Sequence, residues 1–156
     1  MAISSPLDTL SELTRDARDN ASIELSGLRR SRQDAVAQLE TLTSYRHEYR
    51  QRLQQAMETG IGPDSWQNYQ QFLASLDSAI ARARQTLVER EAALAQGQQR
   101  WQVEQRKLCA YDTLASRRDR AERQRMTRQE QRLSDEAAAG VLRRHQTNDS
   151  HSGSSH

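Results

Sequence analysis

The chain has 156 residues, of which 35% are apolar and only 4% are aromatic, and its formal net charge is +2. This composition excludes a wide globular core and leaves either a thin seam between long helices or a disordered chain. No apolar run reaches the ~18–20 residues of a membrane span, and the N-terminus does not read as a secretory signal. A lone cysteine, Cys109, excludes an internal disulfide and is typical of a reducing compartment, so we expect a cytoplasmic protein.

Apolar residues recur at every seventh position in the first part of the chain, which indicates a helix with one buried stripe. The stripe consists of Leu7, Thr14, Ala21, Leu28, Ala35, Leu42, Tyr49 and Ala56. Ser4, Ser5 and Pro6 are start signals, and Gly60 is well placed to follow the C-cap. We therefore predict a helix from about residue 7 to 58.

A second stripe begins after a break in the sequence. It consists of Trp66, Leu73, Ile80, Leu87, Leu94, Trp101, Leu108 and Ala115. The stretch "TGIGP" at residues 59–63 contains two glycines and a proline, which do not continue a helix. Pro63 and Asp64, with Gln67 completing a capping-box pattern, indicate a new start. We predict a bend at 59–64 and a second helix over about 65–135.

A short bend between helices with complementary stripes favours antiparallel packing. With the bend centred near residue 59–60, the numbers of facing residues sum to about 118, which places Tyr49 beside Tyr69. The sequence thus predicts an all-α fold, a long antiparallel two-helix coiled-coil hairpin with a longer C-terminal helix, over residues 1–140. Residues 141–156 lack periodicity and are predicted to be a disordered polar tail.

Nothing in the sequence indicates catalysis. The "GIG" at residues 60–62 lacks the Lys-Ser/Thr of a phosphate-binding loop. Cys109 follows a seam position, should point outward, and has no histidine placed to activate it. The spacing of His145, His151 and His156 matches no structural metal site. We predict no catalytic residue, no cofactor and no metal, and a protein that acts by contact.

Aromatic residues gather near the bend, where five of the seven in the chain occur. They are Tyr45, Tyr49, Trp66, Tyr69 and Phe72. One interpretation is that their rings simply close the end of the hairpin. However, Leu73 already holds the seam beside Phe72, which leaves Phe72 on the flank, and aromatic side chains are favoured anchors in interfaces. The cluster is therefore also a candidate partner surface.

Arginine is concentrated after residue 116. The residues are Arg117, Arg118, Arg120, Arg123, Arg125, Arg128 and Arg132, with the acids Asp119, Glu122 and Glu130 among them. Such a segment binds nucleic acid or an acidic protein surface, or is a solvated helix held by Glu/Arg pairs. The absence of interleaved aromatic residues and of a recognised binding motif argues against nucleic acid.

Two stretches carry a resemblance to a known family: "YRHEYRQRL" at 45–53 and "GIGPDSWQNYQQFLASLDSAI" at 60–80. They resemble the flagellar type III export protein FliJ family, and "NYQQF" after a tryptophan is the most specific part. "LDTLSEL" at 7–13 and "RWQVEQRKLCAYDTL" at 100–114 also fit. The resemblance covers residues 7 to about 140.

The resemblance implies a non-enzymatic hairpin similar to the central stalk of rotary ATPases. Such a protein sits in the export ATPase hexamer, promotes its assembly, links it to the export gate in the inner membrane and handles unloaded export chaperones. Its free ends enter the ATPase ring, and its gate contact lies near the bend. The matching gate residues are Gln38, Leu42, Tyr45, Tyr49, Phe72, Leu76 and Ala79.

Two alternatives remain open from the sequence: an arginine-rich coiled coil that binds nucleic acid, and the equivalent stalk of a virulence type III secretion system. The gate residues also raise a conflict. Leu42 and Tyr49 occupy seam positions, and a fully buried residue cannot also form a contact surface.

Overall fold

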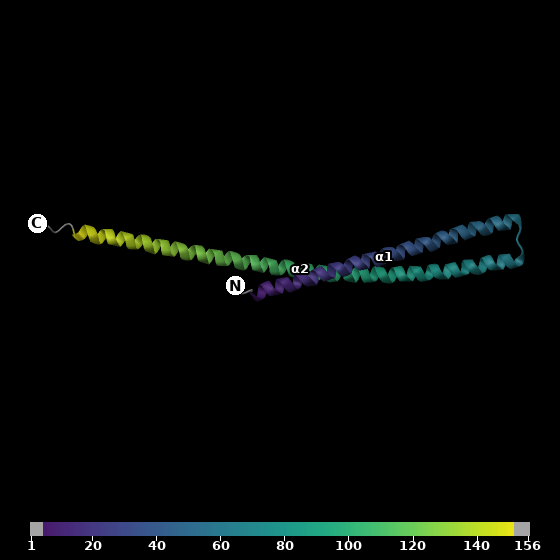
Figure 1. The fold of residues 1–156 in the computed structure, drawn as a ribbon, viewed down its shortest axis with the longest axis horizontal. Coiled ribbons are helices and arrows are strands. Elements are labelled where there is room, and N and C mark those ends of the chain that lie inside the picture. Colours follow the sequence, from purple (N-terminus) through teal and green to yellow (C-terminus); the bar gives the residue numbers. More distant parts are fainter. Residues whose placement is uncertain (1–4, 152–156) are drawn as a thin grey trace. The chain divides into compact units, whose positions relative to one another are not determined.

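The computed structural model describes residues 5–151, and these form two helices (Figure 1). Helix α1 spans Pro6–Thr59 and helix α2 spans Pro63–His151, with 54 and 89 residues respectively. The two run antiparallel on either side of a bend at residues 60–62. The predicted all-α hairpin with a longer second helix is confirmed.

The chain divides into two compact units, and both helices contribute to each. The first, here called the bend unit, is Glu12–Leu108. The second, here called the terminal unit, combines Met1–Ser11 with Cys109–His156. The bend and the predicted gate residues all belong to the bend unit, whereas the arginine-rich segment belongs to the terminal unit.

The bend is shorter than the predicted segment 59–64. Gly60 has a φ of 86°, a left-handed conformation that glycine adopts without strain, and its N–H bonds the carbonyl of Met57 at 3.3 Å. Helix α2 already begins at Pro63, and the Trp66 N–H bonds the Gly62 carbonyl at 3.1 Å. Asp64 therefore lies inside the first turn, where its charge complements the helix dipole, and the predicted capping box with Asp64 as N-cap does not form.

Helix α2 also extends beyond its predicted end near residue 135. It continues to His151, so the segment predicted as a disordered tail is helical over 141–151. Ala, Arg, Gln and Glu, which have high helix propensity, dominate the preceding stretch, and no proline follows Pro63. Gly140 alone costs only about 1 kcal/mol of helix propensity. Residues 152–156 of the predicted tail lie outside the described residues.

The seam follows the heptad stripe of the sequence. Every heptad position of α1 from Leu7 to Ala56 is buried or half-buried. The buried residues of both helices are Thr14, Ala21, Leu25, Ala35, Leu53, Leu76, Ile80, Gly97 and Leu108. Trp66, the first position of the second stripe, is 40% exposed instead, because it stands at the open end of the seam beside the bend.

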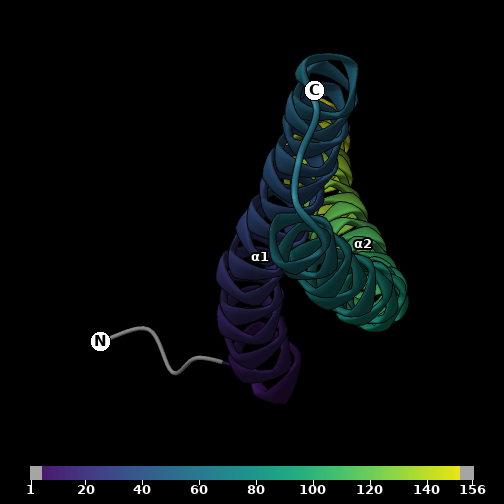
Figure 2. The same ribbon diagram turned by 90° about the vertical axis from the view of Figure 1, so that its right-hand side faces the viewer.

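The separation of the helices varies along the bend unit. Large side chains occur where the helices are far apart, and a glycine occurs where they are close. A Cβ atom built on Gly97 would lie only 2.4 Å from Cδ1 of Leu28, so the helices are in close contact there. Nearer the bend the two ribbons lie farther apart (Figures 1 and 2). Aromatic rings occupy this wider end, and Gly97 occupies the narrow part.

The register differs from the predicted one by about one helical turn. Across the bend unit, Arg32 Nε lies 3.4 Å from Glu91 Oε1 and Arg46 Nε lies 2.7 Å from Asp77 Oδ1. The residue numbers of both pairs sum to 123 rather than about 118. The difference arises because the bend at residues 60–62 is centred at Ile61 rather than near residue 59–60.

In the terminal unit, the start of α1 is fixed by a reciprocal capping box. The Ser5 N–H donates to Asp8 Oδ2 and the Asp8 N–H donates to Ser5 Oγ, both at 3.2 Å. The Arg118 guanidinium of α2 donates to Ser5 Oγ and, at 3.4 Å, to Asp8 Oδ1. These contacts lower the pKa of Asp8, chiefly through the Ser5 hydrogen bonds and secondarily through Arg118.

Candidate partner-binding site near the bend

Three aromatic rings form one cluster in the bend unit. The Tyr49 ring centroid lies 4.1 Å from that of Phe72 and 5.5 Å from that of Tyr69, with interplanar angles of 35° and 57°. Tyr49 and Tyr69 are half-buried, whereas Phe72 is 44% exposed. The two tyrosines therefore close the seam, whereas Phe72 is held against Tyr49 with nearly half of its surface in solvent.

Helical spacing explains this arrangement. Tyr49 is a stripe residue of α1, and Tyr69 follows the stripe residue Trp66 of α2 by three positions. The two rings lie beside each other, as the sequence predicts. Phe72 comes three residues after Tyr69, which places it on the same side of α2 but at the edge of the seam, beside Leu73. Leu73 is half-buried and takes the seam position at that level.

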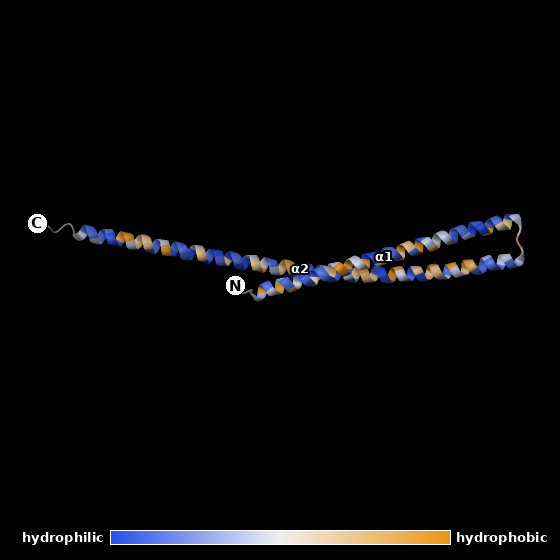
Figure 3. Cartoon of the chain, in the orientation of Figure 1, coloured by the Kyte–Doolittle hydropathy of each residue, from blue (hydrophilic) through white to orange (hydrophobic). Residues whose placement is uncertain are grey.

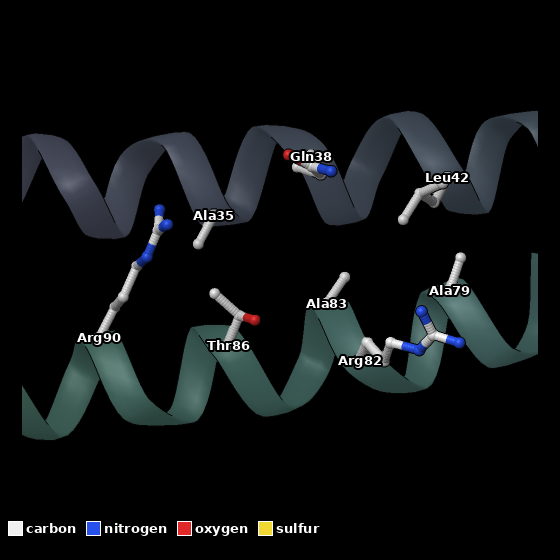
Figure 4. A pocket seen from close by; sticks show the side chains of 8 residues that line it. All are labelled: Ala35, Gln38, Leu42, Ala79, Arg82, Ala83, Thr86 and Arg90. Atoms are coloured by element: carbon white, nitrogen blue, oxygen red, sulfur yellow. The ribbon is translucent and has the colours of Figure 1, made fainter.

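A groove of about 400 Å³ lies between the helices next to this cluster. Its lining residues are Ala35, Gln38, Leu42, Ala79, Arg82, Ala83, Thr86 and Arg90. Figure 4 shows Leu42 and Ala79 pointing toward each other, with Ala83 directed toward α1 between Gln38 and Leu42. The short alanine side chains do not fill the space between the helices, and this shortage of side-chain volume creates the groove.

Two arginines, Arg82 and Arg90, line the groove. Arg90 Nη1 donates to the Ser31 carbonyl at 2.8 Å, which closes one end of the groove with a fixed cation. Arg82 is exposed along the same wall. A partner side chain entering this groove would meet an apolar floor and a cationic rim.

The predicted gate residues fall into four groups in the structure. Gln38, Leu42 and Ala79 line the groove, and Tyr49 and Phe72 belong to the ring cluster. Tyr45, between these two groups on α1, is 55% exposed. Leu76 is different: only 7% of its surface is exposed, so it stabilises the seam and offers a partner almost nothing to touch.

Five groove residues lie outside the predicted set: Ala35, Arg82, Ala83, Thr86 and Arg90. Ala35 is a stripe residue of α1, and Ala83 comes three residues after the stripe residue Ile80, so the heptad pattern indicated the seam side for both. Arg82 and Thr86 could not be assigned by stripe position, because both gain their place only from the register of the two helices.

No group of three or more potential ligand side chains is arranged to hold a metal among residues 5–151. Cys109 is exposed, as its position after a seam residue predicts. Within the same described part of the chain, neither helix has a stretch long and apolar enough to cross a membrane.

The fold and the site together define a helical hairpin with a candidate binding surface on its flank near the bend. Comparison with known proteins places this hairpin in a family. Residues 3–147 match the family model described as "Flagellar FliJ protein". The chain is 34% identical over 138 residues to the flagellar FliJ protein of Salmonella typhi, which covers 88% of this chain and 94% of the relative. The flagellar FliJ protein of Escherichia coli (strain K12) gives the same identity and coverage. The chain belongs to the flagellar FliJ protein family.

Proposed function

We propose that this protein is a non-enzymatic component of the flagellar type III protein export apparatus. It acts as a stalk that promotes the assembly and activity of the export ATPase hexamer, couples that hexamer to the export gate in the membrane, and handles export chaperones. It works in the cytoplasm and associates peripherally with the inner membrane through the export apparatus. Family membership supports the flagellar assignment over a virulence secretion system.

The gate contact is the part of this proposal that the bend unit supports most directly. Phe72 combines exposure with a fixed position, since its ring packs 4.1 Å from that of Tyr49. A rigid, exposed aromatic residue loses little conformational entropy on binding, which is why such residues dominate interface energetics. The adjacent groove adds a recess for a side chain of the partner, with Gln38 and Leu42 on one wall and Ala79 on the other.

The ATPase contact is assigned to the terminal unit. In the terminal unit, α1 begins beside Arg118, and α2 continues from there to His151. Residues 119–138 are exposed all round. A helix that is polar on every side gains little from packing on its own chain, and a surrounding protein would supply the contacts that it lacks.

The gate assignment is tested by measuring binding of the purified cognate gate protein to Phe72→Ala. Val88→Ala is the matched control, because Val88 is also an exposed apolar residue of α2 in the bend unit, at 60% exposure. We expect Phe72→Ala to weaken binding about thirtyfold, the effect of losing an aromatic hot spot, and Val88→Ala to stay within about twofold. Equal binding by both variants would refute the assignment of the bend to the gate.

The ATPase assignment is tested by the ATPase rate and ring assembly of the cognate enzyme. The test variant ends after Asp119, which keeps the Arg118 contacts with Ser5 and Asp8 and so preserves the start of α1. We expect the full chain to stimulate the ATPase, the truncated chain not to stimulate it, and Phe72→Ala to stimulate it normally. A folded full-length chain that leaves both assembly and rate unchanged contradicts the stalk role.

A further inference from the structure

The arginines of α2 that follow the start of α1 gather on one side of the helix. The arginine face comprises Arg117, Arg120, Arg123, Arg125, Arg128 and Arg132. All six side chains are exposed. At about 100° per residue they cover an arc of about 200° around the helix axis.

The remaining side of this segment has a different chemistry. Its acids are Asp119, Glu122 and Glu130, and they share an arc of about 80° with the apolar residues Met126 and Leu133. Met126 is 63% and Leu133 is 60% exposed. Positive and negative side chains are thus sorted onto different sides of one helix, rather than alternating around it.

The helix-stabilising Glu/Arg pairs that the sequence left as an alternative are not formed in this segment of the described structure. Between residues 116 and 132, the ion pairs in the described structure all involve Arg118, with Asp8 at 3.4 Å and with Asp119 at 4.0 Å. Arg120, Arg123 and Arg128 instead surround one shallow hollow on the helix surface, together with uncharged Gln124 and Thr127. Three guanidinium groups within about two turns repel one another unless an anion lies between them.

The arginine face also points away from the side of α2 that contacts α1. In the terminal unit, the half-buried residues Tyr111, Ala115 and Arg118 mark the seam side. By helical phase this side continues into the arc of Glu122 and Met126, opposite the centre of the arginine face. The start of α1 therefore leaves the arginine face uncovered.

We propose that the arginine face binds a carboxylate-rich surface of the export ATPase, an inference that rests on the stalk role proposed above. Guanidinium groups pair with carboxylates through two parallel hydrogen bonds, so a row of them fixes both the position and the orientation of the helix. Residues 116–132 contain seven arginines and three acids, and the acids lie on the arc opposite the arginine face. No aromatic residue is interleaved with these arginines, so the sorted charge suits a directional contact with protein, whereas nucleic acid favours aromatic platforms beside the positive charge.

The test is a triple variant of the full-length chain, Arg120→Gln, Arg123→Gln and Arg128→Gln. Glutamine has nearly the helix propensity of arginine, so α2 is retained, and circular dichroism verifies this. The matched control is Glu122→Gln with Glu130→Gln on the opposite arc. Affinity for the cognate export ATPase is measured at several salt concentrations. We expect the triple variant to bind about tenfold more weakly, with a flatter salt dependence, and the control to bind at least as tightly as the unaltered chain.

Each result discriminates between the claims. Binding of the triple variant within about twofold of the unaltered chain overturns the arginine-face proposal and leaves the stalk role intact. No binding by the folded, unaltered chain refutes the stalk role and the arginine-face assignment with it. Tight, steeply salt-dependent binding of a single-stranded DNA oligonucleotide, lost in the triple variant while ATPase binding persists, assigns the face to nucleic acid and likewise overturns the proposal.

Discussion

Replacing Gly97 by alanine tests how closely α1 and α2 approach each other in the bend unit. Gly97 is buried, and a Cβ atom added to it would lie 2.4 Å from Cδ1 of Leu28, much closer than two carbon atoms approach in ordinary van der Waals contact. Gly27 lies in the middle of α1, is exposed, and has nothing within 4 Å of such a Cβ atom. The two glycines therefore form a matched pair, one confined by the partner helix and one open to solvent.

The expected magnitudes follow from two opposing effects. Alanine is favoured over glycine within a helix by about 0.5–1 kcal/mol, so Gly27→Ala should raise the free energy of unfolding by that amount. Gly97→Ala gains the same propensity but must displace the Leu28 methyl group by about 1 Å or more, and such overpacking costs about 1–3 kcal/mol. We expect Gly97→Ala to be about 1–3 kcal/mol less stable than Gly27→Ala, with helix propensity cancelling in the comparison.

The assay is urea unfolding followed by far-ultraviolet circular dichroism for the two single variants. Adding Leu28→Ala completes a double-mutant cycle, because removal of the Leu28 methyl groups removes the obstacle. In the Leu28→Ala background, Gly97→Ala should become neutral or stabilising, with a coupling of about 1 kcal/mol or more. If Gly97→Ala stabilised the protein as much as Gly27→Ala does, the close approach of the helices at this position would be refuted.

Three further predictions concern the seam, the bend and the start of α1. Leu76→Ala should lower the free energy of unfolding by about 2–4 kcal/mol in urea unfolding, because Leu76 is a buried seam residue; a loss below about 1 kcal/mol would contradict its burial. Gly60→Ala should destabilise by about 1 kcal/mol owing to its φ of 86°, whereas Gly62→Ala should not, and thermal unfolding of both variants distinguishes them. Because the pKa of Asp8 is lowered in the folded chain, its contribution is present above its ordinary pKa of 3.8 and is lost as the pH falls below that value. Asp8→Asn should therefore lower the melting temperature at pH 6 and make little difference at pH 2.5, and a difference independent of pH would refute the capping role.

The seam was predictable from the sequence because burial in a two-helix hairpin has a single period. Every predicted stripe position in α1 is at least half-buried, down to the polar Thr14. The register between the two helices was not predictable, because it depends on where the bend is centred. The bend is centred at Ile61 instead of near residue 59–60, which shifts ion-paired residues such as Arg32 and Glu91 by about one turn, and no stripe residue marks that difference.

The end of α2 was not predictable for a different physical reason. Periodicity reports burial, and the residues after 118 have no described neighbour to be buried against. Helix formation there depends on propensity and on continuation from the preceding turns, neither of which leaves a pattern. The arginine-rich composition of this segment was visible in the sequence. The arginine side chains share one face of α2 only because the segment forms a continuous helix.

The candidate site near the bend was only partly predictable, because a hairpin two helices wide gives its seam residues two flanks. The resemblance supplied the residues, and the structure decides what each can do. Leu42 and Tyr49 are half-buried, so they both support the seam and reach the surface, whereas Leu76 is buried and Phe72 is largely outside the seam. A loss of binding on mutating Leu42 or Tyr49 could therefore result from a less stable seam as well as from a lost contact with the partner. Mutating Phe72 tests the partner contact alone, because its exposed ring can be removed while the stripe that holds the helices together stays intact.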